Sequence, residues 1–178
     1  MHKSLLAVGV VFLLGSSVAL GEPDTYLTGK VGPLWFLGDF DDLDTGVNLN
    51  AAIGIKPIEF LAFELESGYF WGEDTGAVDV ELWGVPMLAN ARLTIPLFFL
   101  ELSAGLGVGG FYLSSEAGSA DDDDWVFGGD AFAGVGFSLG PVTLGVEAKY
   151  YLTEEADLFG QGVEFEGIAA MATARLDF

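Results

Sequence analysis

The stretch GVEFEGIAAMATARLDF, residues 162–178, decides how the chain folds. From Ile168 onward its residues alternate strictly, and every second one up to Phe178 is apolar. The residues between them are small, polar or charged, with one methionine among them. A period of two is the period of a β-strand, because successive side chains leave opposite faces of the pleat. Such a strand needs a neighbour at each edge.

Seven further stretches alternate in the same way. They span residues 26–35, 47–55, 63–71, 81–95, 100–112, 127–139 and 142–152. Pro86 lies inside the fourth and cannot donate to a ladder, so we expect a bulge or a break there. The sequence therefore predicts an all-β fold of eight strands.

The connections between these stretches alternate in length. Short ones cover residues 56–59, 96–98 and 140–141, whereas long acidic ones cover 39–46, 72–79, 114–124 and 153–162. Regular alternation predicts an antiparallel up-and-down meander with all long loops at one end. Strands of about ten residues match the length of a tilted strand in a transmembrane barrel.

The first 21 residues have the features of a cleavable secretory signal. A basic start at Lys3 precedes an apolar run over residues 5–14, which is shorter than the roughly 20 residues of a membrane-spanning helix. Ala19-Leu20-Gly21 fits a cleavage site before Glu22, and Ser17-Val18-Ala19 fits almost as well. We therefore expect residues 1–21 to be a signal peptide and residues 22–178 to form one barrel domain.

Composition excludes several classes of function. The chain has no cysteine, and its one histidine, His2, lies in the predicted signal, so the mature protein lacks disulfides and the commonest general base. A pI near 4.1 argues against a nucleic-acid partner. The mean hydropathy is nevertheless +0.47, which indicates that charged and apolar surfaces are segregated in space.

Alternation alone does not tell which face meets solvent, and a soluble barrel would enclose the apolar face. Three features favour the opposite arrangement. The polar faces are rich in small residues that suit a narrow interior, aromatic residues gather near strand ends, and loop lengths differ between the two ends. In hydrocarbon an open sheet edge would leave backbone groups without partners, so the first and last strands must close the barrel.

The chain resembles the small eight-stranded outer-membrane barrels of Gram-negative bacteria, of the OmpA/OmpX-like kind. The resemblance is carried by residues 28–32 (TGKVG), residues 63–66 (FELE) and the alternating end at Phe178. It implies a location in the outer membrane and contact with its lipid. It also implies that the last strand with Phe178 is the signal read by the barrel assembly machinery. No residues follow Phe178, so a peptidoglycan-binding domain is not expected.

Charged residues on the polar faces predict an ion-pair network inside the lumen. Its members are Lys30, Glu64, Glu66, Arg92, Glu101, Asp130, Glu147, Lys149 and Arg175. Buried charges persist when they are paired and hydrogen-bonded. We expect Arg92 opposite Glu101, Glu64 close to Arg92, and Lys30 near Arg175. The alternative is a water-filled lumen in which these groups are solvated singly.

Carboxylates crowd the long connections, which contain no Lys or Arg. Candidate Ca²⁺ ligands are Asp39, Asp41, Asp42, Asp44, Asp121, Asp122, Asp123 and Asp124. Their spacing does not match an EF-hand, and a solvated acidic rim is the alternative.

No enzymatic activity and no cofactor are expected, because a Ser–His site cannot be built and only a Glu64–Glu66 dyad remains. The sequence predicts a monomeric barrel with a structural or surface-interaction role and a plugged lumen. The alternative is a narrow, cation-preferring small-solute channel of porin type.

Overall fold

The computed structural model describes residues 24–38, 40, 43–74, 80–117, 120–158 and 161–178. The predicted signal peptide and the cleavage sites lie outside the described residues. No helix in the described part of the chain is long and apolar enough to cross a membrane.

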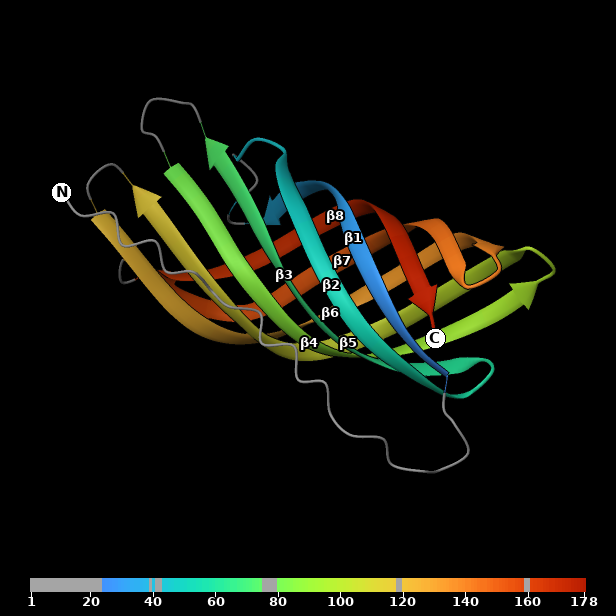
Figure 1. Ribbon diagram of the computed structural model, residues 1–178. Helices are drawn as coiled ribbons and strands as arrows, with labels where there is room; N and C mark the ends of the chain where they lie inside the picture. Colours follow the sequence, from blue (N-terminus) through green and yellow to red (C-terminus); the bar gives the residue numbers. More distant parts are fainter. Residues whose placement is uncertain (1–23, 39, 41–42, 75–79, 118–119, 159–160) are drawn as a thin grey trace.

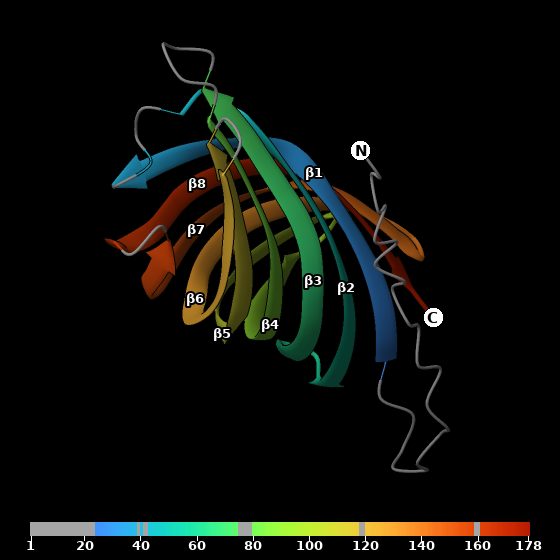
Figure 2. The same ribbon diagram turned by 90° about the vertical axis from the view of Figure 1, so that its left-hand side faces the viewer.

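Eight antiparallel strands form a closed barrel, in which each strand pairs with its sequence neighbours and β1 pairs with β8 (Figure 1). The strands are β1 (Asp24–Gly38), β2 (Gly46–Ile58), β3 (Leu61–Asp74), β4 (Val80–Leu97), β5 (Leu100–Ala117), β6 (Ala120–Leu139), β7 (Val142–Leu158) and β8 (Gln161–Asp177). The predicted fold class is confirmed, and Figure 2 shows the strands wrapping around one interior.

The closing seam involves the last residue of the chain. Phe178 N donates to Thr25 O at 2.9 Å, and the Thr25 hydroxyl donates to Phe178 O at 3.0 Å. Asp177 N also donates to Pro141 O at 2.8 Å, which ties the end of β8 to the turn before β7. Both edges of the terminal strand are therefore paired, as a strand in an apolar medium requires.

Two ends of the barrel can be told apart. The turn end carries the connections Glu59–Phe60, Phe98–Phe99 and Gly140–Pro141, and the loop end carries those at residues 39–45, 75–79, 118–119 and 159–160. Two of the expected long loops are mostly strand: β5 and β6 pair up to Ala117↔Ala120, and β7 and β8 up to Leu158↔Gln161. The acidic stretches at residues 114–117, 120–124, 153–158 and 161–162 continue the ladder because carboxylates beyond an apolar belt can face water on either side of a strand.

The expected bulge at Pro86 is absent, but the expected break is present on one side, because the β3–β4 ladder is interrupted there and no pair joins Gly68 and Tyr69 to Pro86 and Val85. The β3–β4 register is the same on either side of it, with Ser67↔Met87 and Phe70↔Gly84, and Pro86 pairs with Phe111 on β5. Register shifts occur elsewhere, near Ile55 to Ile58 and near Leu152 to Glu155.

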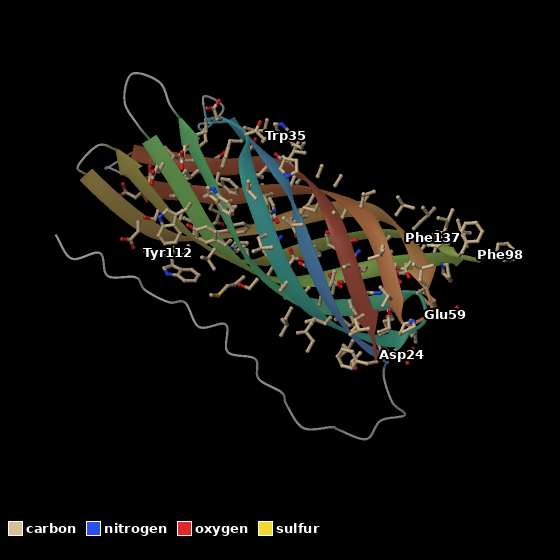
Figure 3. All side chains as sticks on the ribbon, turned by 45° about the horizontal axis from the view of Figure 1, so that its top comes forward. Asp24, Trp35, Glu59, Phe98, Tyr112 and Phe137 are labelled. Carbon is tan, nitrogen blue, oxygen red and sulfur yellow. The ribbon has the colours of Figure 1, made fainter. Side chains whose placement is uncertain are left out.

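The apolar face of the strands points outward (Figure 3). Leu65 and Leu106 are 67% and 68% exposed, and Val146 on β7 is similarly open. The charged and amide side chains of the opposite face are buried, among them Lys30 and Asn48. This reversal of the usual soluble pattern is what a barrel surrounded by lipid requires.

Candidate functional site: the barrel lumen

The interior is layered along the barrel axis. Near the loop end lies an apolar layer built around Phe36, Phe70, Phe111 and Phe165, all buried. The rings of Phe70 and Phe165 stack with centroids 4.6 Å apart and an interplanar angle of 6°. These residues come from β1, β3, β5 and β8, so the layer brings together strands from around the barrel.

Below the apolar layer, Glu66 on β3 is the acceptor shared by two ammonium groups. Lys30 Nζ lies 2.7 Å from Glu66 Oε2, and Lys149 Nζ lies 2.6 Å from Oε1. Asn50 and Asn90 donate to the same carboxylate at 2.8 and 3.1 Å. Four donors thus satisfy a carboxylate that has no access to water.

Arg92 on β4 joins two further carboxylates. Its Nε donates to Glu64 Oε1 and its Nη2 to Glu147 Oε2, both at 2.7 Å. The Tyr26 hydroxyl also donates to Glu64 Oε1 at 2.7 Å, and Lys30 Nζ lies 2.8 Å from Glu147 Oε1. The Arg92, Lys30 and Lys149 pairs therefore form one connected network rather than separate pairs.

Phe132 on β6 lies at the centre of this network. The cationic groups of Arg92, Lys30 and Lys149 lie 4.4, 5.3 and 5.1 Å from its ring centroid. An aromatic face attracts a cation most strongly where water is excluded. The ring therefore fills the middle of the lumen and adds attraction for all three cations.

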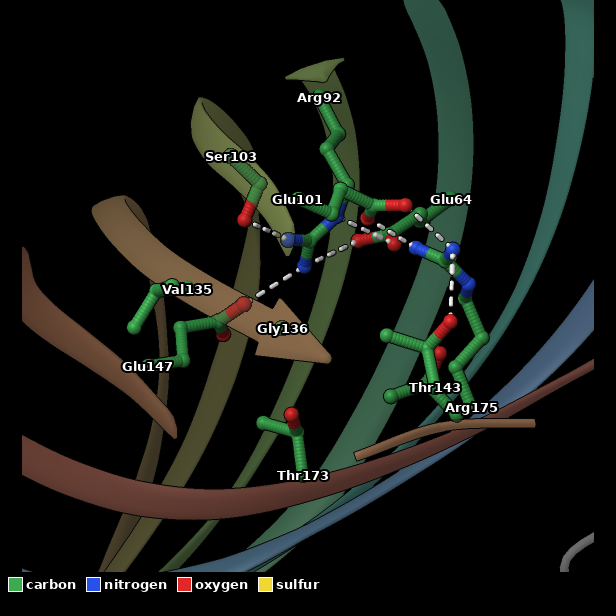
Figure 4. A pocket seen from close by; sticks show the side chains of 11 residues that line it. Glu64, Arg92, Glu101, Ser103, Val135, Gly136, Thr143, Glu147, Thr173 and Arg175 are labelled. Carbon is green, nitrogen blue, oxygen red and sulfur yellow. Dashed lines mark hydrogen bonds and ion pairs between the residues drawn. The ribbon is translucent and has the colours of Figure 1, made fainter. Parts of the chain in front are cut away.

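A second, partly exposed cluster lies near the turn end. Arg175 on β8 pairs with Glu101 through both terminal nitrogens, with Nη2 2.6 Å from Oε2, and its Nε donates to Asp177 at 3.1 Å. Lys56 Nζ lies 2.6 Å from Asp177 Oδ1. A small cavity of about 30 Å³ lies between this cluster and Arg92 (Figure 4), which is room for a few water molecules at most.

The expected Arg92–Glu101 pair is wrong. The β4–β5 register places Arg92 opposite Gly105 and Glu101 opposite Pro96, so the two side chains are not cross-strand neighbours. Arg92 turns to Glu64, and Glu101 reaches Arg175 on a strand that is not its neighbour. In the β1–β8 register Lys30 is opposite Thr173 and Arg175 is opposite Thr28, so the two cations are diagonal neighbours. Each of them pairs with carboxylates that the other does not contact.

Several lumen residues were not anticipated. Tyr26 and the three asparagines Asn48, Asn50 and Asn90 hydrogen-bond inside the barrel, and Asn48 and Asn50 both donate to the Tyr151 hydroxyl, at 2.8 and 2.7 Å. The sequence could have indicated them, because they occupy inward-facing positions of the predicted strands and each buried carboxylate needs several hydrogen-bond donors.

The acidic candidates for Ca²⁺ are spread over the loop end. Asp39, Asp41 and Asp42 lie outside the described residues, Asp44 is exposed, and residues 121–124 belong to β6. Successive residues of a strand point to opposite faces, so Asp122 and Asp124 lie on the face opposite to that of Asp123. Where side chains are described, no group of three or more acidic residues could hold a metal.

Neither a protein-family model nor a curated protein matches the sequence. Solved structures do match the fold. The Neisserial surface protein A structure is 15% identical over 86% of this chain and 97% of that one, with a TM-score of 0.72. OprG of Pseudomonas aeruginosa is 11% identical over 88% and 96%, with a TM-score of 0.54.

Ail of Yersinia pestis, in complex with the heparin analogue sucrose octasulfate, is 15% identical over 88% of this chain and 99% of that one, with a TM-score of 0.54. At such identities the likeness concerns the fold alone. The chain has the fold of the small eight-stranded outer-membrane β-barrels.

Proposed function

We propose that this protein is an integral outer-membrane barrel with a structural or surface-interaction role and a lumen closed to solutes. The observation that carries the proposal is the burial of charge in the middle layer. The side chains of Lys30, Glu66 and Lys149 have no accessible surface, although each bears a full charge. A conducting path would hydrate at least one of them, because an ion in transit keeps water or replaces it with polar groups.

The aromatic layer supports closure independently of the ion pairs. Phe70 and Phe165 stack across the lumen, and Phe36 and Phe111 contact Phe165 with centroids 6.2 and 6.1 Å apart. Apolar constrictions obstruct ions by excluding water. A solute would therefore meet two barriers of different chemistry in series.

The alternative, a narrow cation-preferring channel, is supported by one feature. The cavity near the turn end is lined by Glu64, Glu101 and Glu147, which would attract cations into the lumen. Each of these carboxylates is paired with an arginine or a lysine, however, which reduces that attraction.

Conductance in planar lipid bilayers separates the two functions. We expect no steady current from the wild type. A variant combining Glu66→Ala, Lys149→Ala, Phe70→Ala and Phe165→Ala should conduct, because it removes parts of both barriers. Each pair of substitutions alone should remain closed, and Leu65→Ala on the lipid side is the matched control. A steady, cation-selective current from the wild type would support the channel instead.

An enzymatic role is not proposed. Glu64 Oε1 accepts from Tyr26 and Arg92, and both oxygens of Glu66 accept from cations or amides. A carboxylate held in this way has a structural task and is not positioned to take a proton from a substrate.

The loop end is where a surface partner would bind, and its charge restricts the partner. Exposed carboxylates there include Glu73, Glu81, Asp123, Glu154 and Glu155. The loop-end stretches contain no Lys or Arg, so a sulfated polyanion of the kind bound in the Ail structure is unsuited. We expect heparin-coated resin to retain none of the folded protein at physiological salt.

A further inference from the structure

Two buried oxygen atoms lie close together inside the barrel, and no described side chain or backbone group donates a hydrogen bond to either of them. Asn90 on β4, Gly107 on β5 and Asp130 on β6 form one rung of the sheet. A Cβ atom added to Gly107 would lie 1.9 Å from Asn90 Oδ1 and 2.3 Å from Asp130 Oδ1. The separation of the two oxygens therefore cannot exceed the sum of those two distances, and both occupy the space over the glycine.

Neither oxygen has a hydrogen-bond donor among the described residues. Asn90 and Asp130 are each 3% exposed, so bulk water does not supply one. Buried acceptors without a partner are rare and cost free energy, and two that face each other also repel. The arrangement calls for a donor between them.

Rotating the Asn90 amide does not provide that donor. Its Nδ2 already donates to Glu66 Oε2 at 3.1 Å. Exchanging the amide oxygen and nitrogen would satisfy Asp130 but would place the amide oxygen against the Glu66 carboxylate. The pattern of donors around Glu66 therefore fixes the amide orientation.

The charge balance of the middle layer also indicates that one positive charge is missing. With every group ionised, the layer has three cations and four carboxylates. They are Lys30, Arg92 and Lys149, with Glu64, Glu66, Asp130 and Glu147. The cluster at the turn end is balanced, with Lys56 and Arg175 against Glu101 and Asp177. One negative charge of the buried layer has no counterpart, and buried charge is stable when compensated.

We propose that Asp130 is a proton-binding site that holds its proton at neutral pH. The proton lies on Oδ1 and is donated to Asn90 Oδ1, while Oδ2 stays in contact with Lys149 Nζ. Lys149 remains paired with the Glu66 carboxylate. The charged groups around Asp130 are Lys149, Glu66 and Lys30. The bound proton satisfies both orphaned oxygens and brings the layer to neutrality.

Infrared spectroscopy of the protein refolded in lipid vesicles tests the site. The wild type at neutral pH should show the carbonyl band of a protonated carboxylic acid, which Asp130→Asn should lack. Asp123→Asn, an exposed change on the same strand, should retain the band. Absence of the band from the wild type would overturn the proposal, and this readout does not depend on whether any variant folds.

Unfolding in urea supplies a second readout. Asp130→Asn replaces the acid with a neutral donor of the same shape, so its midpoint should match that of the wild type. Asp130→Ala should lower the midpoint, because Asn90 Oδ1 loses its donor. A midpoint for Asp130→Asn as low as that of Glu66→Gln would show that the ionised form is needed. A wild-type midpoint that rises with sodium or potassium concentration, without the infrared band, would assign the site to a metal cation and refute the proton.

Discussion

Lys30 on β1 and Glu66 on β3 meet inside the barrel with Nζ 2.7 Å from Oε2, although β2 lies between their strands. Both side chains are fully buried. Backbone hydrogen bonds join only adjacent strands, so this contact joins parts of the wall that the sheet does not connect directly. The lumen network thus acts as a set of braces across the barrel, and its removal should affect the stability of the whole barrel.

Glu66→Gln should be strongly destabilising. It leaves Lys30 and Lys149 buried without the charge they share, and breaking a buried pair costs about 3 to 5 kcal/mol. The free energy of unfolding in urea, measured on vesicle-embedded protein, checks this. Glu59→Gln, in the exposed turn after β2, is the matched control and should change stability little. Equal stability of the two variants would refute the bracing role.

Gly107→Ala should cost about 1 to 3 kcal/mol through overpacking, since its Cβ would overlap both Asn90 Oδ1 and Asp130 Oδ1. Gly29→Ala offers a direct comparison, because nothing lies within 4 Å of a Cβ at that position. Urea unfolding of both variants should separate them clearly. Indistinguishable midpoints would mean that the space over Gly107 is not occupied as described.

Leu65→Arg should lower stability by about 2 to 4 kcal/mol if the outward face lies in hydrocarbon near the middle of the bilayer. Leu65 lies between Phe63 and Tyr69 on the exposed face of β3 and points away from the lumen, so the loss would come from lipid contact and not from core packing. Leu65→Phe keeps the apolar character and should be tolerated. Should the arginine variant unfold at the wild-type midpoint, the exposed apolar face would not be a lipid surface.

The sequence predicted which charges face the lumen and that Glu64 lies close to Arg92, but it did not predict the other pairs. Alternation places Arg92 and Glu101 on the polar faces of their strands, and the small residues, the aromatic strand ends and the loop lengths indicate that these faces point inward. Pairing depends on the register of a hairpin and on which strands lie across the lumen. Glu101 finds Arg175 from β8, and that contact exists only after the barrel has closed.

Two members of the aromatic layer were missed for a related reason. Phe36 and Phe165 lie beyond the ends assigned to the alternating runs, in stretches where acidic residues interrupt the apolar pattern. Those stretches remain in the ladder, with Phe36↔Gly167 and Gly38↔Phe165 paired between β1 and β8. Outside the apolar belt both faces can carry carboxylates, so the hydropathy pattern stops before the strand does.

Phe98→Gly should stabilise the barrel by about 1 kcal/mol. Phe98 has φ of 58°, a left-handed conformation that costs a residue with a side chain about 1 to 2 kcal/mol, and its ring is fully exposed. Phe99→Gly in the same turn should do the opposite, because the Phe99 ring contacts Phe137 with centroids 5.3 Å apart. Urea midpoints of the two variants should therefore move in opposite directions, and a shift of both to lower urea would contradict the strain argument.

Phe178→Ala should impair assembly in cells without impairing the folded barrel. The backbone of Phe178 closes the seam with Thr25, and any residue can make those bonds. Its ring is 70% exposed on the lipid side, so it contributes little packing within the chain.

If the ring is read by the assembly machinery, the amount of folded barrel in the outer membrane should fall several-fold, while refolding of purified protein into vesicles proceeds as for the wild type. Leu176→Ala, two residues earlier on the same outward face, is the control and should assemble normally. An equal loss for both variants in cells would mean that apolar surface on β8, and not the terminal aromatic, is what assembly requires.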